Sequence, residues 1–253
     1  MPTVPTILDK SPSSTRISRK KPSPATKTKP LSSQLPNLAY RTAAVLVFIG
    51  VLSALSPYIF PPELYLQIVK PLYGEAYVAE QLPKLSTYPV QETVHRLLGS
   101  AYMIIGLLQF TPQFRKKHYR RHRILGRIFV VMSLLVGLGG MVMSVFYPFA
   151  GPWEAVPTLL FGAYFLVSTY LAYHYARRRK IKQHQHWMVR SFSLALAIST
   201  IRIVFLASHQ LTNWDQHTLF IASIWVSWIL HVIFTEAGIY LANTSASKAR
   251  KFA

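Results

Sequence analysis

Residues 115–127 read RKKHYRRHRILGR, and this stretch decides how the chain is arranged. It holds 7 arginine and lysine side chains within 13 positions. An apolar run ends shortly before it at Phe110, and another begins at Ile124. Positive charge of this density stays on the cytoplasmic side of a membrane. The stretch therefore predicts the direction of the two membrane-spanning helices beside it.

The composition and its distribution along the chain also indicate a membrane protein. The 253 residues carry a formal net charge of +20 and include no cysteine. Apolar residues gather in runs of about 18 or more, which is the length that spans a bilayer. The basic residues flank these runs, where the positive-inside bias places them, so we exclude nucleic acid as a partner. The absence of cysteine excludes disulfides and iron or zinc sites held by thiolates.

Six apolar stretches are long enough to be spans, at about residues 41–60, 93–110, 124–147, 158–175, 187–207 and 219–241. If the chain crosses the membrane once at each stretch, every segment rich in lysine and arginine lies on the same side of the membrane. The fold class we expect is all-α: a polytopic transmembrane helical bundle with six spans and both termini in the cytoplasm. The lipid bilayer is the expected partner, and the plasma (inner) membrane is the expected location. Protein partners stay unassigned.

The regions outside the spans differ in composition. Residues 1–37 are rich in Ser, Thr, Pro and Lys, which predicts a disordered basic cytoplasmic tail. A transit peptide is the less favoured alternative, because this segment has many prolines and no amphipathic face. Residues 38–245 form the expected transmembrane domain, and 246–253 a second basic tail. The segment 63–92 is comparatively acidic and is expected outside, with residues 63–73 lying along the interface.

Charged residues within spans are expensive and by default mark function. Arg127, Arg190 and Glu236 fall at similar depths near the cytoplasmic ends of their helices. We expect Glu236 to pair with Arg127 or Arg190, and a structural ion pair is the favoured interpretation.

A second group of charges falls near the outer side. Arg202 lies roughly 22 Å along its helix from Trp187. His95 and Arg96 enter the second span at that level. Arg202 continues a helical stripe of small residues, which predicts that it faces the bundle. Snorkelling of its guanidinium towards the interface is the alternative.

Histidines on successive helices raise the question of haem. Neutral imidazoles at matching depth are the ligands that a bis-histidine haem b needs, with glycine nearby for close packing. His95 is followed at helical spacing by Gly99 and Gly106, and His122 by Gly126 and Gly137. The alternative is that the glycines serve helix packing and the histidines are solvated.

Several motifs together resemble a known family. In chain order they are His95-x-x-x-Gly99, Gln109-Phe110, His122-Arg123-x-x-Gly126-Arg127, His184-x-x-Trp187-Met188-x-Arg190-Ser191, and Arg202. This series resembles the predicted membrane protein family catalogued as domain of unknown function 2306 (DUF2306), over about residues 90–240. The resemblance implies a membrane helical bundle but does not identify a reaction that the protein catalyses. His231 stands where that family usually has Asn, so a haem site would use His95, His122 or His184.

Three functional hypotheses follow. In the leading one the protein binds haem b or carries out redox chemistry with His95, His122 and His184 as ligands. The arginines that would then neutralise the propionates are Arg123, Arg127 and Arg190. In the second, a transporter or sensor binds a small anionic solute in an outward cavity lined by His95, Arg96 and Arg202.

The third hypothesis is a structural membrane protein without a ligand. Because the chain has no Gly-rich nucleotide loop, GxSxG or HExxH motif, the sequence assigns no catalytic residue and no enzyme class. It also assigns no metal-ion site apart from the haem hypothesis.

Overall fold

The computed structural model describes the backbone of residues 31–251 and the side chains of residues 37–79, 83 and 87–244. Within that part of the chain the secondary structure is helical, with no strand. Most of the predicted tail over residues 1–37 lies outside the described residues. Its last residues, from Leu31, instead begin the first helix. The side chains of the predicted tail over residues 246–253 also lie outside them.

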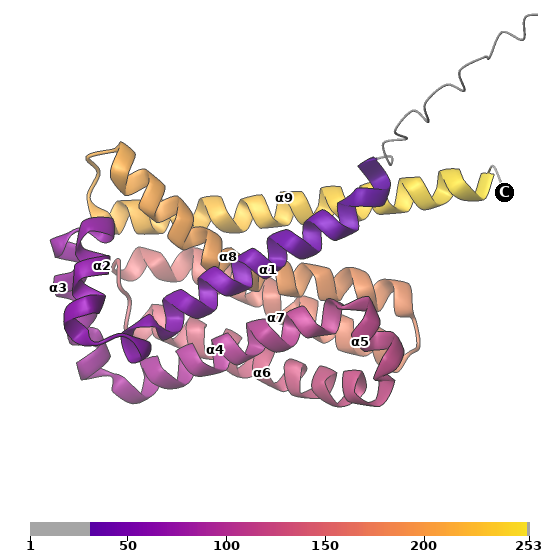
Figure 1. Cartoon of the computed structure of the whole chain (residues 1–253), viewed down its shortest axis with the longest axis horizontal. Coiled ribbons are helices and arrows are strands. Elements are labelled where there is room, and N and C mark those ends of the chain that lie inside the picture. The colour runs from indigo at the N-terminus through magenta and orange to yellow at the C-terminus, as the bar shows by residue number, and fades with distance from the viewer. Residues whose placement is uncertain (1–30, 252–253) are drawn as a thin grey trace, which may run out of the picture.

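The long helices run side by side and alternate in direction along the chain (Figure 1). They are α1 (Leu31–Ile59), α4 (Pro89–Phe110), α6 (Tyr119–Phe146), α7 (Ala155–Arg177), α8 (Ile181–Leu211) and α9 (Gln216–Lys251). Helix α8 is central, because it packs against α1, α4, α7 and α9. The helices extend beyond most of the predicted span limits, since the polar residues at the ends of the apolar runs continue the same helical turns.

In the described part of the chain, five helical segments are long and apolar enough to cross a membrane: Asn37–Ile59, Tyr119–Phe146, Pro152–Arg177, Ile181–Leu211 and Gln216–Thr244. Each overlaps one of the predicted spans. Helix α4, the predicted second span, is not among them. His95, Arg96 and Gln109 lower its mean hydropathy, although it packs within the bundle against α1, α6 and α8.

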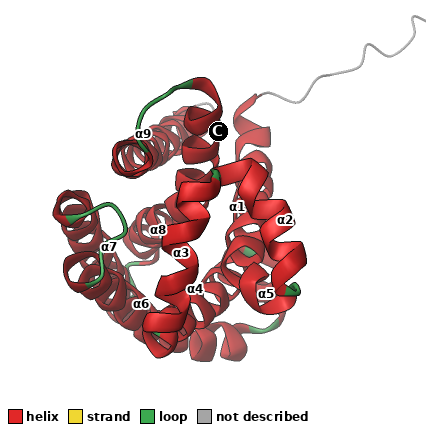
Figure 2. Cartoon of the chain, turned by 90° about the vertical axis from the view of Figure 1, so that its left-hand side faces the viewer, coloured by secondary structure: helices red, strands yellow, loops and turns green. Residues whose placement is uncertain are grey.

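One end of the bundle, the α2–α3 end, carries two short helices that lie across it (Figures 1 and 2). These are α2 (Pro62–Tyr73) and α3 (Glu75–Thr87). Between them Gly74 has a φ of 85°, a conformation that residues with a Cβ rarely adopt. Helix α2 contacts α1 and α8, and α3 contacts α4. The sequence correctly predicted a separate segment here, and its first helix covers the stretch expected at the interface.

Aromatic side chains join these short helices to the bundle. The rings of Tyr73 and Tyr77 stack with centroids 4.8 Å apart, and each lies within 6 Å of the Phe205 ring on α8. The Phe149 ring contacts Tyr77 at 5.6 Å and Phe220 of α9 at 4.9 Å. Phe149 precedes a short 3-10 helix, η1 (Pro152–Glu154). Such ring pairs stabilise a fold beyond the area they bury, so α2 and α3 are fixed on the bundle end.

The opposite end, called the basic end below, carries the lysine- and arginine-rich connections (Figure 1). The first contains the short helix α5 (Pro112–Lys117), and the second is the turn at residues 178–180. Both connections lie at this same end, which is the arrangement that the charge pattern predicts.

Candidate functional site

Three basic side chains at the α2–α3 end lie within electrostatic range of one another: His95 and Arg96 from α4, and Arg202 from α8. We call them the cationic cluster. The helical stripe that leads to Arg202 faces the bundle as predicted, because Ser191 and Ser199 on it are fully buried. Ser199 Oγ also donates a hydrogen bond to the backbone oxygen of Leu46 on α1, at 2.6 Å. Arg202 therefore lies where α8 meets α1 and α4.

Arg202 is partly buried and has few partners. Its Nη1 donates to the backbone oxygen of Ile198, one turn earlier on α8, at 2.8 Å. Among the residues with described side chains, no carboxylate forms a salt bridge with it. A guanidinium has five N–H donors, and most of those of Arg202 have no acceptor among the described residues.

Three tyrosine side chains of the short helices lie within electrostatic range of this guanidinium. They are Tyr65 and Tyr73 of α2 and Tyr77 of α3. Burial raises the pKa of Tyr77 to about 12, and the positive charge of Arg202 acts in the opposite direction. Burial also raises the pKa values of Tyr65 and Tyr73, again opposed by the charge of Arg202. Each phenol therefore remains a protonated donor at neutral pH, close enough to Arg202 to feel its charge.

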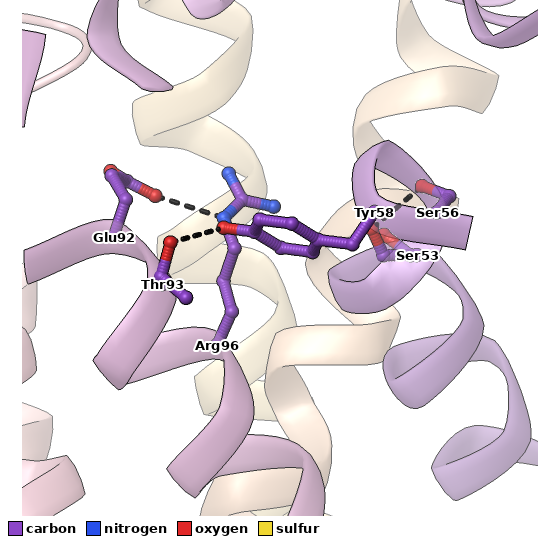
Figure 3. A network of polar contacts seen from close by, with 6 residues as sticks. All are labelled: Ser53, Ser56, Tyr58, Glu92, Thr93 and Arg96. Carbon is purple, nitrogen blue, oxygen red and sulfur yellow. Dashed lines mark hydrogen bonds and ion pairs between the residues drawn. The ribbon is translucent and has the colours of Figure 1, made fainter. Parts of the chain in front are cut away.

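Arg96, by contrast, is already paired. Its Nε donates to Glu92 Oε2 at 2.9 Å, one turn earlier on α4, and both side chains are less than one-fifth exposed. Figure 3 shows this pair beside Tyr58 of α1, whose hydroxyl forms a hydrogen bond of 3.0 Å with Thr93 Oγ1. The Tyr58–Thr93 bond connects α1 and α4, whereas the Glu92–Arg96 pair lies within α4. Because Glu92 neutralises Arg96, the excess positive charge of the cluster belongs to Arg202.

His95 packs against a flat surface on α6. A Cβ added at Gly139 would lie 3.5 Å from His95 Nδ1, and one at Gly140 would lie 3.4 Å from its Cε1. The two glycines thus give the imidazole its space. Helix α6 therefore helps to position the third member of the cluster.

At the basic end the structure confirms the predicted ion pair and identifies its partners. Arg190 Nε and Nη2 donate to Glu236 Oε1 and Oε2 at 2.6 and 2.7 Å. The guanidinium of Arg190 also lies 4.6 Å from the ring centroid of Trp187. Arg127, the other predicted partner, is exposed on α6. The bidentate geometry joins α8 to α9 and fits the structural role that was expected.

The candidate haem residues do not surround one centre. His122 and His184 lie towards the basic end, whereas His95 lies at the α2–α3 end. Arg123 and Arg127 are exposed, and Arg190 is engaged with Glu236. In the described part of the chain, no group of three or more His, Cys, Asp or Glu side chains could hold a metal ion.

Two of the four glycines of the haem hypothesis, Gly106 and Gly137, serve close helix packing, whereas a Cβ added at Gly99 would meet no described atom within 4 Å. The side chain of Phe192 from α8 fills the space over Gly106. A Cβ added at Gly137 would lie 2.7 Å from Leu166 Cδ2 of α7. The packing alternative therefore describes these two positions. What remains of the haem hypothesis is two histidines. His122 Nδ1 is buried and has no partner among the described residues, and His184 Nδ1 is 2.9 Å from the backbone oxygen of Ala172.

Sequence reasoning missed two features. The tyrosines near Arg202 come from the segment that was predicted to lie outside, in which residues 63–73 were interpreted only as an interfacial helix. The second is a polar seam between α8 and α9, centred on His231. Its Nδ1 is 3.0 Å from Ser193 Oγ and its Nε2 is 2.9 Å from Thr200 Oγ1. The spacing of these hydroxyl residues on α8 was the available signal.

Comparison with known proteins agrees with this architecture. No curated protein and no solved structure matches the chain. Residues 93–239, more than half of the chain, match the family described as "Predicted membrane protein (DUF2306)". The match begins within α4 and ends within α9, so it includes the cationic cluster and the Arg190–Glu236 pair. The helical bundle, its apolar helices and this match together show that the chain belongs to the DUF2306 family of predicted membrane proteins.

Proposed function

We propose that this protein binds a small anionic solute at the α2–α3 end of its bundle, as a transporter or a sensor. The observation that carries the proposal is Arg202, a partly buried guanidinium in the bundle without a carboxylate partner among the described side chains. A charge within a membrane-spanning bundle is expensive, and such charges commonly mark ligand pathways.

The chemistry around Arg202 favours an anion. Guanidinium groups bind carboxylate and phosphate through two parallel hydrogen bonds. The hydroxyls of Tyr65, Tyr73 and Tyr77 would add neutral donors, and His95 adds an imidazole. Because Glu92 already neutralises Arg96, one bound anion would balance the charge of Arg202. The same donor set would repel a cation.

The proposal includes a topology. We propose that α4 also crosses the membrane, as the second span in chain order, which brings the number of spans to six. We further propose that both termini and the basic end face the cytoplasm and that the protein resides in the plasma membrane. The support is the distribution of lysine and arginine, which favours the cytoplasmic side. Reporter tags after Tyr119 and after Lys180 should respond from the cytoplasm, and one near Pro152 from the opposite side. Opposite responses from the first two tags would contradict this topology.

Ligand-induced stabilisation tests the anion site. The wild-type protein, purified in an uncharged detergent, is heated with inorganic phosphate, sulfate or acetate at constant ionic strength. A ligand at ten times its Kd stabilises the folded state by about 1.4 kcal/mol. That corresponds to a rise in Tm of roughly 3–6 °C for a chain of this size.

The variants separate recognition from general effects of salt. Arg202→Ala should lose the rise in Tm, and Arg202→Lys should keep part of it because one charge remains. Arg127→Ala removes an exposed arginine at the basic end and should leave the rise unchanged. A protein that none of the anions stabilises, or an equal response in Arg202→Ala, would refute the proposal and favour a structural protein without a ligand.

Haem binding is the second candidate, and one observation favours it. A histidine that ligates a metal usually donates its other ring N–H to a backbone oxygen, and His184 lies 2.9 Å from that of Ala172. An absorption spectrum of protein from haem-replete cells decides the matter. A Soret band that disappears in His122→Ala and in His184→Ala but persists in His95→Ala would support haem at the basic end. A colourless, folded preparation would reject it.

A further inference from the structure

An apolar groove runs along the surface between α1 and α4. It has a volume of about 360 Å³. Its lining consists only of apolar side chains, from α1 residues between Ala44 and Ile59 and from Ile104 and Leu107 of α4. Ile104 is 47% exposed and Leu52 is 41% exposed, so the groove opens towards the surrounding lipid rather than into the core.

The length and position of the groove relate it to the cationic cluster. At 1.5 Å per residue, the lining of α1 extends over roughly 22 Å. Half of a bilayer's hydrocarbon core is about 15 Å thick, so the groove can hold a complete acyl chain. Its last residue on α1 is Ile59, next to Tyr58. The Tyr58–Thr93 hydrogen bond joins α1 and α4 there, with the Arg96 guanidinium beside the phenol (Figure 3).

We infer that the anion is the headgroup of a single-chain amphiphile, whose acyl chain lies in the α1–α4 groove while its carboxylate or phosphate binds at Arg202. This inference rests on the proposed anion site and specifies its ligand class. Charge complementarity identifies the occupant, because the groove ends next to Tyr58 and the Arg96 guanidinium, and Arg96 lies within electrostatic range of Arg202. A partner helix fits less well, since a helix with its side chains is about 10 Å wide and needs a broader face.

The arrangement also assigns a role to Tyr58. Its side chain is 46% exposed at the end of the groove, and its only hydrogen bond among the described residues is the one to Thr93. A headgroup at the Ile59 end of the groove would lie next to this phenol. The Tyr58 hydroxyl can donate as well as accept, so it can bind a headgroup oxygen in place of Thr93.

The test uses full-length protein in nanodiscs of phosphatidylcholine, with inorganic phosphate and dodecyl phosphate as probes. Binding is measured by thermal stabilisation. Ile104→Trp places an indole in the groove, at a position exposed enough for the larger side chain to be accommodated. It should weaken dodecyl phosphate at least tenfold and leave inorganic phosphate unchanged. Leu52→Trp, on the α1 side of the groove, should repeat this result.

Two further variants provide a control for the groove and a test of the anion site. Val45→Trp is a matched control, because Val45 is 57% exposed on α1 and lies outside the groove lining. It should change neither probe. Arg202→Ala should abolish the binding of both probes. If dodecyl phosphate binds equally well to wild type and to both groove variants, the inference is wrong while the anion site stands. If neither probe binds the wild type, the anion site itself fails.

Discussion

The ion pair between Arg190 and Glu236 offers the sharpest test of how the bundle is held together. Both oxygens of the carboxylate accept from the guanidinium, at 2.6 and 2.7 Å. The Arg190 side chain is 17% exposed and that of Glu236 is 45% exposed. Breaking a fully buried pair costs about 3–5 kcal/mol, whereas an exposed pair contributes about 0–1 kcal/mol. Because Glu236 is nearly half exposed, we expect Glu236→Ala to destabilise the protein by about 1–3 kcal/mol.

A double-mutant cycle isolates the interaction itself. Once Arg190 is replaced by Met, removing the carboxylate no longer leaves an unpaired guanidinium at the basic end. Glu236→Ala should then have a much smaller effect, and the coupling free energy should be about 1–2 kcal/mol. The measurement is the free energy of unfolding in mixed micelles for the wild type, the two single variants and the double variant. Arg127→Ala provides the control, with an expected change within about 0.5 kcal/mol.

The cycle can refute this reasoning in two ways. Equal effects of Glu236→Ala in the presence and absence of Arg190 would mean that the two side chains do not stabilise each other. A loss of stability in Arg127→Ala as large as that in Glu236→Ala would mean that arginines at this depth interact mainly with lipid or detergent. The cation–π contact with Trp187 would persist in Glu236→Ala, so it cannot account for the coupling.

Other predictions follow from packing and titration. Gly106→Leu should lower the free energy of unfolding by roughly 1–3 kcal/mol, because Phe192 occupies the space that the new side chain needs. Gly238→Ala is the control and should be tolerated, since a Cβ added there would have no described atom within 4 Å. His231→Leu should cost about 1–3 kcal/mol in unfolding free energy, since it leaves two hydroxyls without their imidazole partner. The folded-state pKa of Tyr77 is raised to about 12, so its contribution to stability should be intact below about pH 10 and lost as the pH rises to about 12. Ultraviolet absorption should detect one late-ionising tyrosine fewer in Tyr77→Phe.

The sequence predicted features that follow from one-dimensional patterns. Runs of apolar residues gave the positions of the long helices, and helical rise gave Arg190 and Glu236 a common depth. The depth argument selected two arginines as partners for Glu236 but could not choose between them. That choice depends on the rotation of α6 and α8 about their axes, which side-chain packing fixes.

Features that depend on contacts between distant segments were harder to predict. The proximity of Tyr77 to Arg202 requires α3 to lie across the end of the bundle, where the Tyr77 ring contacts Phe205 of α8. The sequence left the glycines open between a haem site and helix packing, because spacing alone does not identify what lies beside them. At Gly106 the answer is a phenylalanine that lies 86 residues further along the chain.

Arg190 and Arg202 lie on the same helix and were selected from the sequence for the same reason, as charges within a span. The structure separates them by their partners. Arg190 has a bidentate carboxylate, so its charge is balanced within the fold and its role is structural. Arg202 has one backbone acceptor and neutral phenols around it, so its charge is left to be balanced from outside the described side chains. Holding a guanidinium in the bundle without a carboxylate among the described side chains costs free energy, and we therefore propose the anion site at Arg202.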